Sequence, residues 1–161
     1  FKFSSTSRQT MEIAGFLMEK GIDFQKIIDD SFFAKTYGQA KLHGRAVLDS
    51  VRILDNRCVY TVVTTDELRE YGCTVKATDG IVDQLRIIEG IEIAFLLYQT
   101  GNPDEYKVSL RTISAVDVSR IAQSFGGGGH VKAAGCTMTG EPQEIVEKIS
   151  GKIREQWEEL K

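Results

Sequence analysis

The segment of this chain most able to do chemistry is FGGGGHVKAAG, residues 125–135. Four adjacent glycines carry a large entropic cost on folding, so their presence needs a reason. Without a Cβ, successive backbone amides can turn inward and approach a bound anion closely. We predict a short helical turn from His130 to Ala134, whose free N–H groups would add partial positive charge at the same place. From the rim of this loop, the imidazole of His130 can donate to a phosphate oxygen or move a proton.

Two other glycine-rich phosphate motifs do not fit this segment. The P-loop needs a glycine before its lysine, and Lys132 follows Val131 instead. The dinucleotide-binding pattern G-x-G-x-x-G is also absent, because Val131 and Lys132 stand where its third glycine is required. A purely structural interpretation also stays open, since a glycine commonly follows the end of a helix.

Arg111 is the second candidate, in the segment YKVSLRT at residues 106–112. The period-two pattern of a strand places Lys107, Ser109 and Arg111 on one face, with apolar side chains on the other. A guanidinium can pair with a phosphate at two points. The alternative is an ordinary arginine that faces solvent.

No spacing of His and Asp in the sequence suits a catalytic metal pair. The three cysteines (Cys58, Cys73 and Cys136) form no C-x-x-C pair, and an odd, sparse set is a poor disulfide framework. We therefore expect a reduced, cytoplasmic setting. No apolar run approaches the ~18 residues that span a bilayer, so we expect no membrane association.

The length, composition and charge narrow the class of protein. The 161 residues are 42% apolar and 27% charged, which is typical of one ordinary folded domain with or without an appended piece. The net charge is −3, yet residues 107–132 hold four cations and one anion, a net +3 that leaves −6 elsewhere. This division suits a small anionic ligand better than a long polyanion. Because the first residue is Phe1 rather than Met, we expect a piece of a longer protein.

The predicted elements that position these residues change in type near Asp55 and Asn56. Before that turn we expect the tail of a strand at residues 1–3 and then helices only, at about 8–20, 24–33 and 37–53. After it, strands are expected at 58–64, 91–99, 106–112 and 136–139, alternating with helices at 65–72, 80–89, 117–125 and 142–160. The prediction is an α/β fold: a mixed sheet flanked by helices, preceded by an N-terminal helical linker segment.

The glycine segment resembles the G-G-G-G-H-x-x-A-x-G signature of the DHH-associated C-terminal domain of DHH phosphoesterases. KVSLRT followed by VDVSRIAQSFGGGGH is similar to that family's strand, helix and glycine loop, and TDGIVDQLRIIEGIEIAFLLYQ to the segment before it. FKFSSTSRQTMEIAGFLMEKGID resembles the end of the catalytic DHH domain and its helical linker. The branch most resembled is the bacterial oligoribonuclease (nanoRNase) and pAp phosphatase type.

This resemblance implies a division of the chain and a set of roles. Residues 1–54 would be the end of the DHH domain plus linker, and residues 55–161 the DHH-associated substrate-binding domain. Arg111 and His130 would contact a substrate phosphate, and the amides of Gly127, Gly128 and Gly129 would line the pocket. Lys132 occupies a variable position beside them, so its part in binding is open.

The metal of this family would lie outside this chain. The family's manganese ions are held by Asp and His residues of the N-terminal DHH domain, whose Asp-His-His motif is absent here. We therefore expect this chain to bind no cofactor and to be inactive alone. Its partners would be short RNA or a nucleotide phosphate and the N-terminal DHH catalytic domain, and the apolar strands leave room for a homodimer.

Three hypotheses follow for the function. The first is the substrate-binding part of a manganese-dependent phosphoesterase acting on short oligoribonucleotides, pAp or both. The second is a free-standing module that binds RNA or a linear or cyclic dinucleotide without catalysis. An Asp-His-His motif upstream in the parent gene would separate these two. The third is a structural domain in which the glycines only turn the chain.

Overall fold

The structure, a computed structural model, describes residues 6–160, so the expected strand tail at residues 1–3 lies outside it. The chain divides into two compact units, Phe1–Thr36 and Tyr37–Lys161. None of the helices in the described part is both long and apolar enough to cross a membrane.

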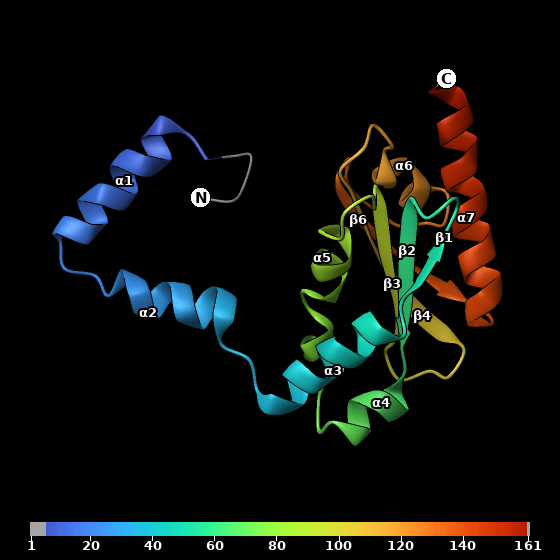
Figure 1. The fold of residues 1–161 in the computed structure, drawn as a ribbon, viewed down its shortest axis with the longest axis horizontal. Coiled ribbons are helices and arrows are strands. Elements are labelled where there is room, and N and C mark those ends of the chain that lie inside the picture. The colour runs from blue at the N-terminus through green and yellow to red at the C-terminus, as the bar shows by residue number, and fades with distance from the viewer. Residues whose placement is uncertain (1–5, 161) are drawn as a thin grey trace. The chain divides into compact units, whose positions relative to one another are not determined.

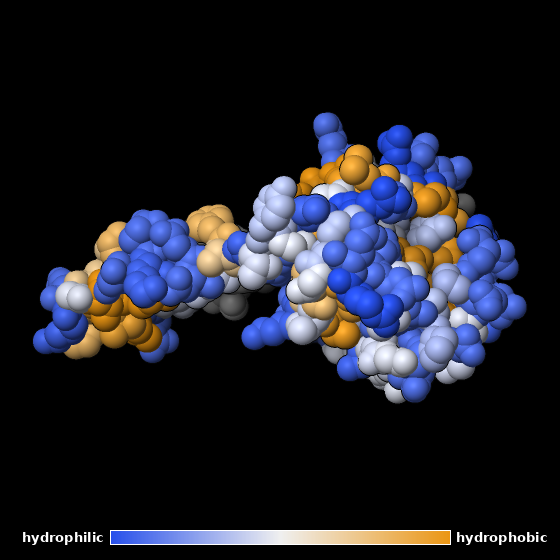
Figure 2. Space-filling view, turned by 90° about the horizontal axis from the view of Figure 1, so that it is seen from below, coloured by the Kyte–Doolittle hydropathy of each residue, from blue (hydrophilic) through white to orange (hydrophobic). Residues whose placement is uncertain are grey.

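The first unit consists of short helices, as predicted. Helix α1 (Arg8–Glu19) begins at a capping box in which the Ser7 hydroxyl accepts from the Thr10 amide. Helix α2 (Phe24–Ile28) begins at Asp23 and continues as a π-helical turn, η1 (Asp29–Phe33). None of these elements buries a side chain, and Figure 2 shows hydrophobic residues on the surface of this unit.

The second unit is built on one six-stranded sheet with the order β1-β2-β3-β4-β6-β5 (Figure 1). Strands β2 and β3 are parallel and the other neighbours antiparallel, which confirms a mixed sheet. Its strands are β1 (Val51–Ile53), β2 (Cys58–Val63), β3 (Ile93–Gln99), β4 (Glu105–Thr112), β5 (Gly128–His130) and β6 (Ala133–Thr139). Its helices are α3 (Tyr37–Leu48), α4 (Thr65–Glu70), η2 (Val75–Thr78), α5 (Ile81–Arg86), α6 (Val118–Gln123) and α7 (Pro142–Glu159).

Helices cover the two faces of the sheet unequally. One face is buried under α6 and α7, in a core that includes Phe95, Leu110 and Ile149. The opposite face is buried only over β2 and β3, where α3 and α5 pack on residues such as Ala94 and Leu96. Figure 1 shows α7 on one side of the sheet and α3 with α5 on the other. The part of the second face that belongs to β4, β6 and β5 is left open.

The expected helix at residues 37–53 ends early, and its last part is wrong. Helix α3 stops at Leu48, and β1 pairs with β2 as an antiparallel edge strand. Leu54, Asp55 and Asn56 have positive φ angles and form the turn between the two strands. Pairing with a neighbouring strand has here overridden a local pattern of helical spacing. Because α3 packs into the same core as β2 and β3, the compact unit begins at Tyr37.

The loop before α6 is fixed by a side chain of α7. The buried Gln156 accepts a hydrogen bond from the Asp117 amide and donates one to the Asp117 carbonyl, each at 2.9 Å. Asp117 is also the N-cap of α6, accepting from the amides of Ser119 and Arg120. The hydrogen bond from the Ser119 hydroxyl is the main reason that the pKa of Asp117 lies below its ordinary value. Burial opposes this shift, and the two amides and the Arg120 charge add to it. The start of α6, and so the glycine run at its end, is tied to the core.

Candidate functional site

The register of three neighbouring strands brings Arg111 and His130 onto the same face of the sheet. Arg111 on β4 is paired with Ala133 on β6, and Ala133 is paired with His130 on β5. Directly paired residues point to the same side, so these three form one row, with Arg111 and His130 two strands, or about 10 Å, apart. We call the exposed side of β4, β6 and β5 the open face.

Two more rows complete the open face. Ser109, Gly135 and Gly128 form the second row, next to that of Arg111 and His130. Lys107 and Thr137 form the third row, beyond the end of β5. Since successive residues on one face of a strand are two positions apart, neighbouring rows lie about 7 Å from each other.

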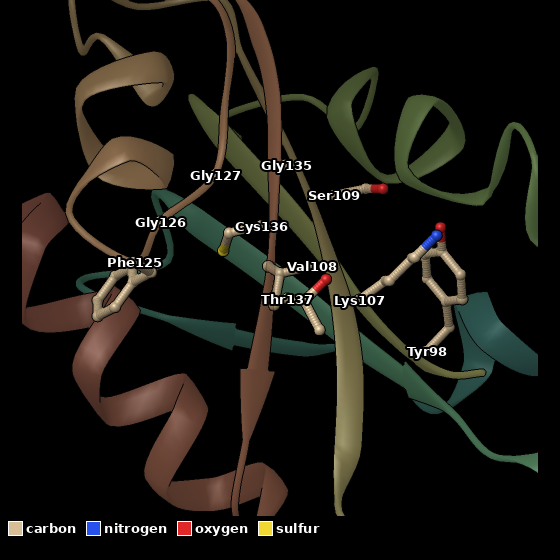
Figure 3. A pocket seen from close by; sticks show the side chains of 10 residues that line it. All are labelled: Tyr98, Lys107, Val108, Ser109, Phe125, Gly126, Gly127, Gly135, Cys136 and Thr137. Atoms are coloured by element: carbon tan, nitrogen blue, oxygen red, sulfur yellow. The ribbon is translucent and has the colours of Figure 1, made fainter. Parts of the chain in front are cut away.

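A shallow cavity of about 360 Å³ crosses the second and third rows. Figure 3 shows its lining, in which Lys107 and Tyr98 lie at one end and Phe125 at the other. The residues that line it are Tyr98, Lys107, Val108, Ser109, Phe125, Gly126, Gly127, Gly135, Cys136 and Thr137. Of the six binding residues predicted from the sequence, only Gly127 is among them. The row of Arg111 and His130 borders this cavity rather than lining it.

The Arg111 side chain is directed toward α5. Its Nε lies 3.4 Å from a carboxylate oxygen of Asp83, and its Nη1 donates to the Leu110 carbonyl at 3.0 Å. The same carboxylate oxygen lies 3.5 Å from Nε of Arg86. Two guanidinium groups therefore share one carboxylate at the edge of the open face. A phosphate that reaches Arg111 would compete with Asp83 for it.

His130 is exposed on the edge strand, and its ring folds back over the hairpin turn. Its Nδ1 accepts a hydrogen bond from the Lys132 amide at 3.4 Å. With Nδ1 as acceptor, the proton of the neutral ring is assigned to Nε2, which can donate to a ligand oxygen. Arg111 and His130 thus share a row but have separate partners.

The helical turn expected at His130 to Ala134 is wrong. These residues form a β-hairpin, β5 and β6, joined by Val131 and Lys132. The amide of Gly127 donates to the Ala122 carbonyl at 2.9 Å, at the end of α6, so it cannot also donate to a ligand. Lys132 donates from its ammonium to the Ser114 carbonyl. The glycine segment forms part of the sheet, because its small residues let β5 and β6 approach each other closely.

Three of the four consecutive glycines are required by the fold. Gly126 has a φ of +74°, which favours glycine, and Gly129 combines a φ of +146° with a Cβ position 2.6 Å from the Ala133 carbonyl oxygen. At Gly127 a Cβ would lie 2.2 Å from the carbonyl oxygen of Gly135. Gly128 has neither restriction: its φ is not in the left-handed region, and a Cβ there would meet nothing within 4 Å. The backbone therefore does not explain why residue 128 is glycine.

Polar side chains that the sequence analysis did not single out also face this site. Burial raises the pKa of Tyr98, nearby Asp79 raises it further, and a hydrogen bond with Ser109 opposes both. The Tyr98 hydroxyl therefore stays protonated and can donate. Ser109 and Lys107 were predicted to share a face with Arg111, and that pattern was the available signal. No pattern in the sequence indicates that Asp83 and Arg86 lie at this site, because only the packing of α5 against the sheet brings them there.

Within residues 6–160, no group of three or more His, Cys, Asp or Glu side chains stands close enough together to hold a metal ion. Apart from Asp83, which is paired with Arg111, the side chains that face the site are cations, hydroxyls and one imidazole, which are ligands for anions. The arrangement can bind a phosphate group and orient it.

Comparison with known proteins relates the whole chain to nucleotide-processing enzymes. It is 27% identical over 157 residues to the bifunctional oligoribonuclease and PAP phosphatase NrnA of Thermus thermophilus, covering 97% of this chain and 46% of that protein. It is also 58% identical over 40 residues to the oligoribonuclease NrnB of Bacillus subtilis, which is 24% of this chain and 10% of that protein. This chain spans about half the length of the first of these relatives.

Solved structures share the fold. An exopolyphosphatase-related protein from Bacteroides fragilis matches with a TM-score of 0.87 and 22% identity, over 96% of this chain and 45% of that one. The pGpG-specific phosphodiesterase PggH from Vibrio cholerae matches with a TM-score of 0.50 and 16% identity, over 73% of this chain and 39% of that one. The model of the DHHA1 domain matches residues 55–158, so this chain belongs to the DHHA1 domain family.

Proposed function

We propose that this chain is the substrate-binding part of a manganese-dependent DHH phosphoesterase that hydrolyses short oligoribonucleotides, pAp (adenosine 3′,5′-bisphosphate) or both. In this proposal the open face holds a phosphate of the substrate. The manganese ions and the reaction belong to an N-terminal DHH domain of the parent protein. The relationship to proteins named as oligoribonucleases supports the class of substrate.

The observation that carries the proposal is the empty space in front of Gly128. This glycine lies in the second row, next to the row of Arg111 and His130, and nothing in the fold requires it. A side chain at this position would project from the open face at its β5 edge. Keeping the position free of a side chain gives a ligand direct access to the backbone.

The charged groups beside this space suit a phosphate. Arg111 offers a planar fork that can replace its partner Asp83 by a phosphate, and His130 offers a ring N–H from the other side of the row. The Asp83 side chain is about half exposed, so its carboxylate can return to water when it is displaced. Lys132 is held at the Ser114 carbonyl, so we assign it no contact with the phosphate.

The test is binding of pAp to the 161-residue chain by titration calorimetry. We expect Arg111→Gln and His130→Asn each to weaken binding about tenfold, which is the loss of one charge-assisted or polar contact of roughly 1.4 kcal/mol. Arg154→Gln is the matched control, because this exposed arginine lies on α7 at the opposite face of the sheet. Unchanged binding in both site variants would contradict the proposal and favour a structural role for the glycines.

The catalytic part of the proposal has its own test. The chain alone, with added manganese, should not cleave pAp or a dinucleotide. Hydrolysis by the pure chain would show that the reaction does not depend on another domain. Binding of RNA by a parent protein without an Asp-His-His motif would instead favour the free-standing binding module.

A further inference from the structure

The Asp83 carboxylate is shared between two arginines that belong to different elements. Arg86 lies three positions after Asp83 on α5, so these two side chains stay neighbours on one helix face. Arg111 comes from β4 and belongs to the row that we assign to the phosphate. One carboxylate oxygen, Oδ1, lies 3.4 Å from Nε of Arg111 and 3.5 Å from Nε of Arg86. The carboxylate therefore stands between a partner on its own helix and a partner that the ligand also needs.

Neither arginine holds this carboxylate at the distance of a strong hydrogen bond. A charge-assisted N–H···O bond measures about 2.7–2.9 Å, which is shorter than both contacts of Asp83. The same spacing of acid and arginine closes further on α4, where Asp66 and Arg69 approach to 2.6 Å. The helical geometry thus permits a shorter contact between Asp83 and Arg86. We attribute their longer separation to the attraction of Arg111 from the other side.

Arg86 also has a donor that no acceptor uses. Its Nε is buried and, among the residues that the structure describes, has no hydrogen-bond partner. A buried N–H without an acceptor costs free energy that a hydrogen bond recovers. A small movement of the Asp83 carboxylate toward Arg86 would supply this acceptor. The Asp83 side chain is about half exposed, so its surroundings do not lock it in place.

We infer that Asp83 is an internal competitor of the substrate phosphate and that Arg86 is the residue that takes over its carboxylate. Before a ligand binds, Asp83 neutralises part of the charge of Arg111. When a phosphate binds Arg111, the carboxylate shifts to Arg86 and satisfies the buried Nε. These two residues of α5 thereby set the affinity of the site without contacting the ligand. The inference rests on the proposed function, because it takes the substrate phosphate to lie at Arg111.

The first experiment measures binding of pAp to the 161-residue chain by titration calorimetry. Asp83→Asn and Asp83→Ser should each raise the affinity at least threefold, because both remove the competing charge. In the Arg111→Gln background, Asp83→Asn should change the affinity less than twofold, because the group competed for is gone. Asp66→Asn is the matched control and should leave the affinity unchanged. It removes the acid of the equivalent pair on α4 and alters the net charge by the same amount.

The second experiment tests the part assigned to Arg86. Arg86→Gln should weaken binding of pAp at least threefold, because the displaced carboxylate then has no second partner. In the Asp83→Asn background, Arg86→Gln should change the affinity less than twofold. Arg86→Lys should restore most of the lost affinity, because it keeps a cation beside Asp83. Thermal unfolding of every variant checks that the fold is intact.

The possible failures are distinct. Unchanged or lower affinity in Asp83→Asn would overturn the inference, and a lower value would mean that Asp83 orients Arg111 for the ligand. Equal weakening by Arg86→Gln with and without Asp83 would also overturn it, since Arg86 would then contact the ligand itself. If Arg111→Gln still weakens binding in these cases, the proposed function stands. If neither Arg111→Gln nor His130→Asn weakens binding, the proposed function fails, and the inference fails with it.

Discussion

Gly127 and Gly128 are neighbours in the same motif, yet the structure predicts opposite effects when each is replaced by alanine. At Gly127 the new methyl group would lie 2.2 Å from the Gly135 carbonyl oxygen and 2.5 Å from Cβ of Cys136. Both contacts are with paired or buried parts of β6, which cannot move aside cheaply. At Gly128 the methyl group would enter open space.

The sizes of the two effects follow from these contacts. We expect Gly127→Ala to lower the free energy of unfolding by about 2–3 kcal/mol, the usual cost of forcing extra atoms into a packed region. In a chain of this length that corresponds to a fall in Tm of roughly 4–12 °C. Gly128→Ala should leave the stability unchanged or raise it by up to about 1 kcal/mol, because alanine loses less backbone entropy than glycine on folding.

Ligand binding separates the two positions a second time. Gly128→Ala should weaken binding of pAp at least tenfold at unchanged stability, because its methyl group occupies the space assigned to the ligand. The measurements are thermal unfolding for stability and titration calorimetry for affinity, on both variants and the wild type. A Gly128→Ala protein that is stable and binds pAp normally would refute the reasoning, since the free space would then have no connection with the ligand.

Three further predictions concern the core around the site. Gln156→Leu should lower the free energy of unfolding in urea by about 2–3 kcal/mol, because it leaves the buried amide and carbonyl of Asp117 without partners. The pKa of Asp117 is lower in the folded state, so the ionised carboxylate stabilises the fold fully above pH 3.8, and this stabilisation is lost as the pH falls through the folded-state pKa. Between pH 5 and about 2, the Asp117→Asn variant should therefore lose less stability than the wild type. Burial raises the pKa of Cys58 to about 12 and that of Cys136 to about 11, so iodoacetamide at pH 8 should label both far more slowly in the native protein than in urea.

The sheet was predictable because, for most of its strands, the pattern of apolar residues indicates which faces are buried. The runs at β2 and β3 are apolar on both faces, and β4 alternates, which indicates one buried and one open face. That alternation also predicted that Lys107, Ser109 and Arg111 share a side. The ends of the elements were harder to predict. The helix expected at residues 37–53 ran into β1, a three-residue edge strand that forms through its pairing with β2.

The details of the site depend on contacts that lie far apart in the sequence. A glycine run followed by His130 fits an anion-binding turn as well as a hairpin, and only the space beside β6 selects the hairpin. The partner of Arg111 comes from α5, 28 positions earlier in the chain. No local pattern predicts which carboxylate will meet a given arginine after packing. The residue types were therefore predictable, and their partners were not.

The structure also changes the meaning of the positive charge in residues 107–132. Two of its four cations do not serve the open face: Arg120 forms an ion pair with α7, and Lys132 is bound to a backbone carbonyl. The two that remain are Lys107 and Arg111, and within residues 6–160 only Arg111 of these two has an acidic partner, Asp83. A phosphate that arrives at Arg111 must therefore displace the Asp83 carboxylate, which stays on the protein, so the new ion pair is formed at the expense of an existing one.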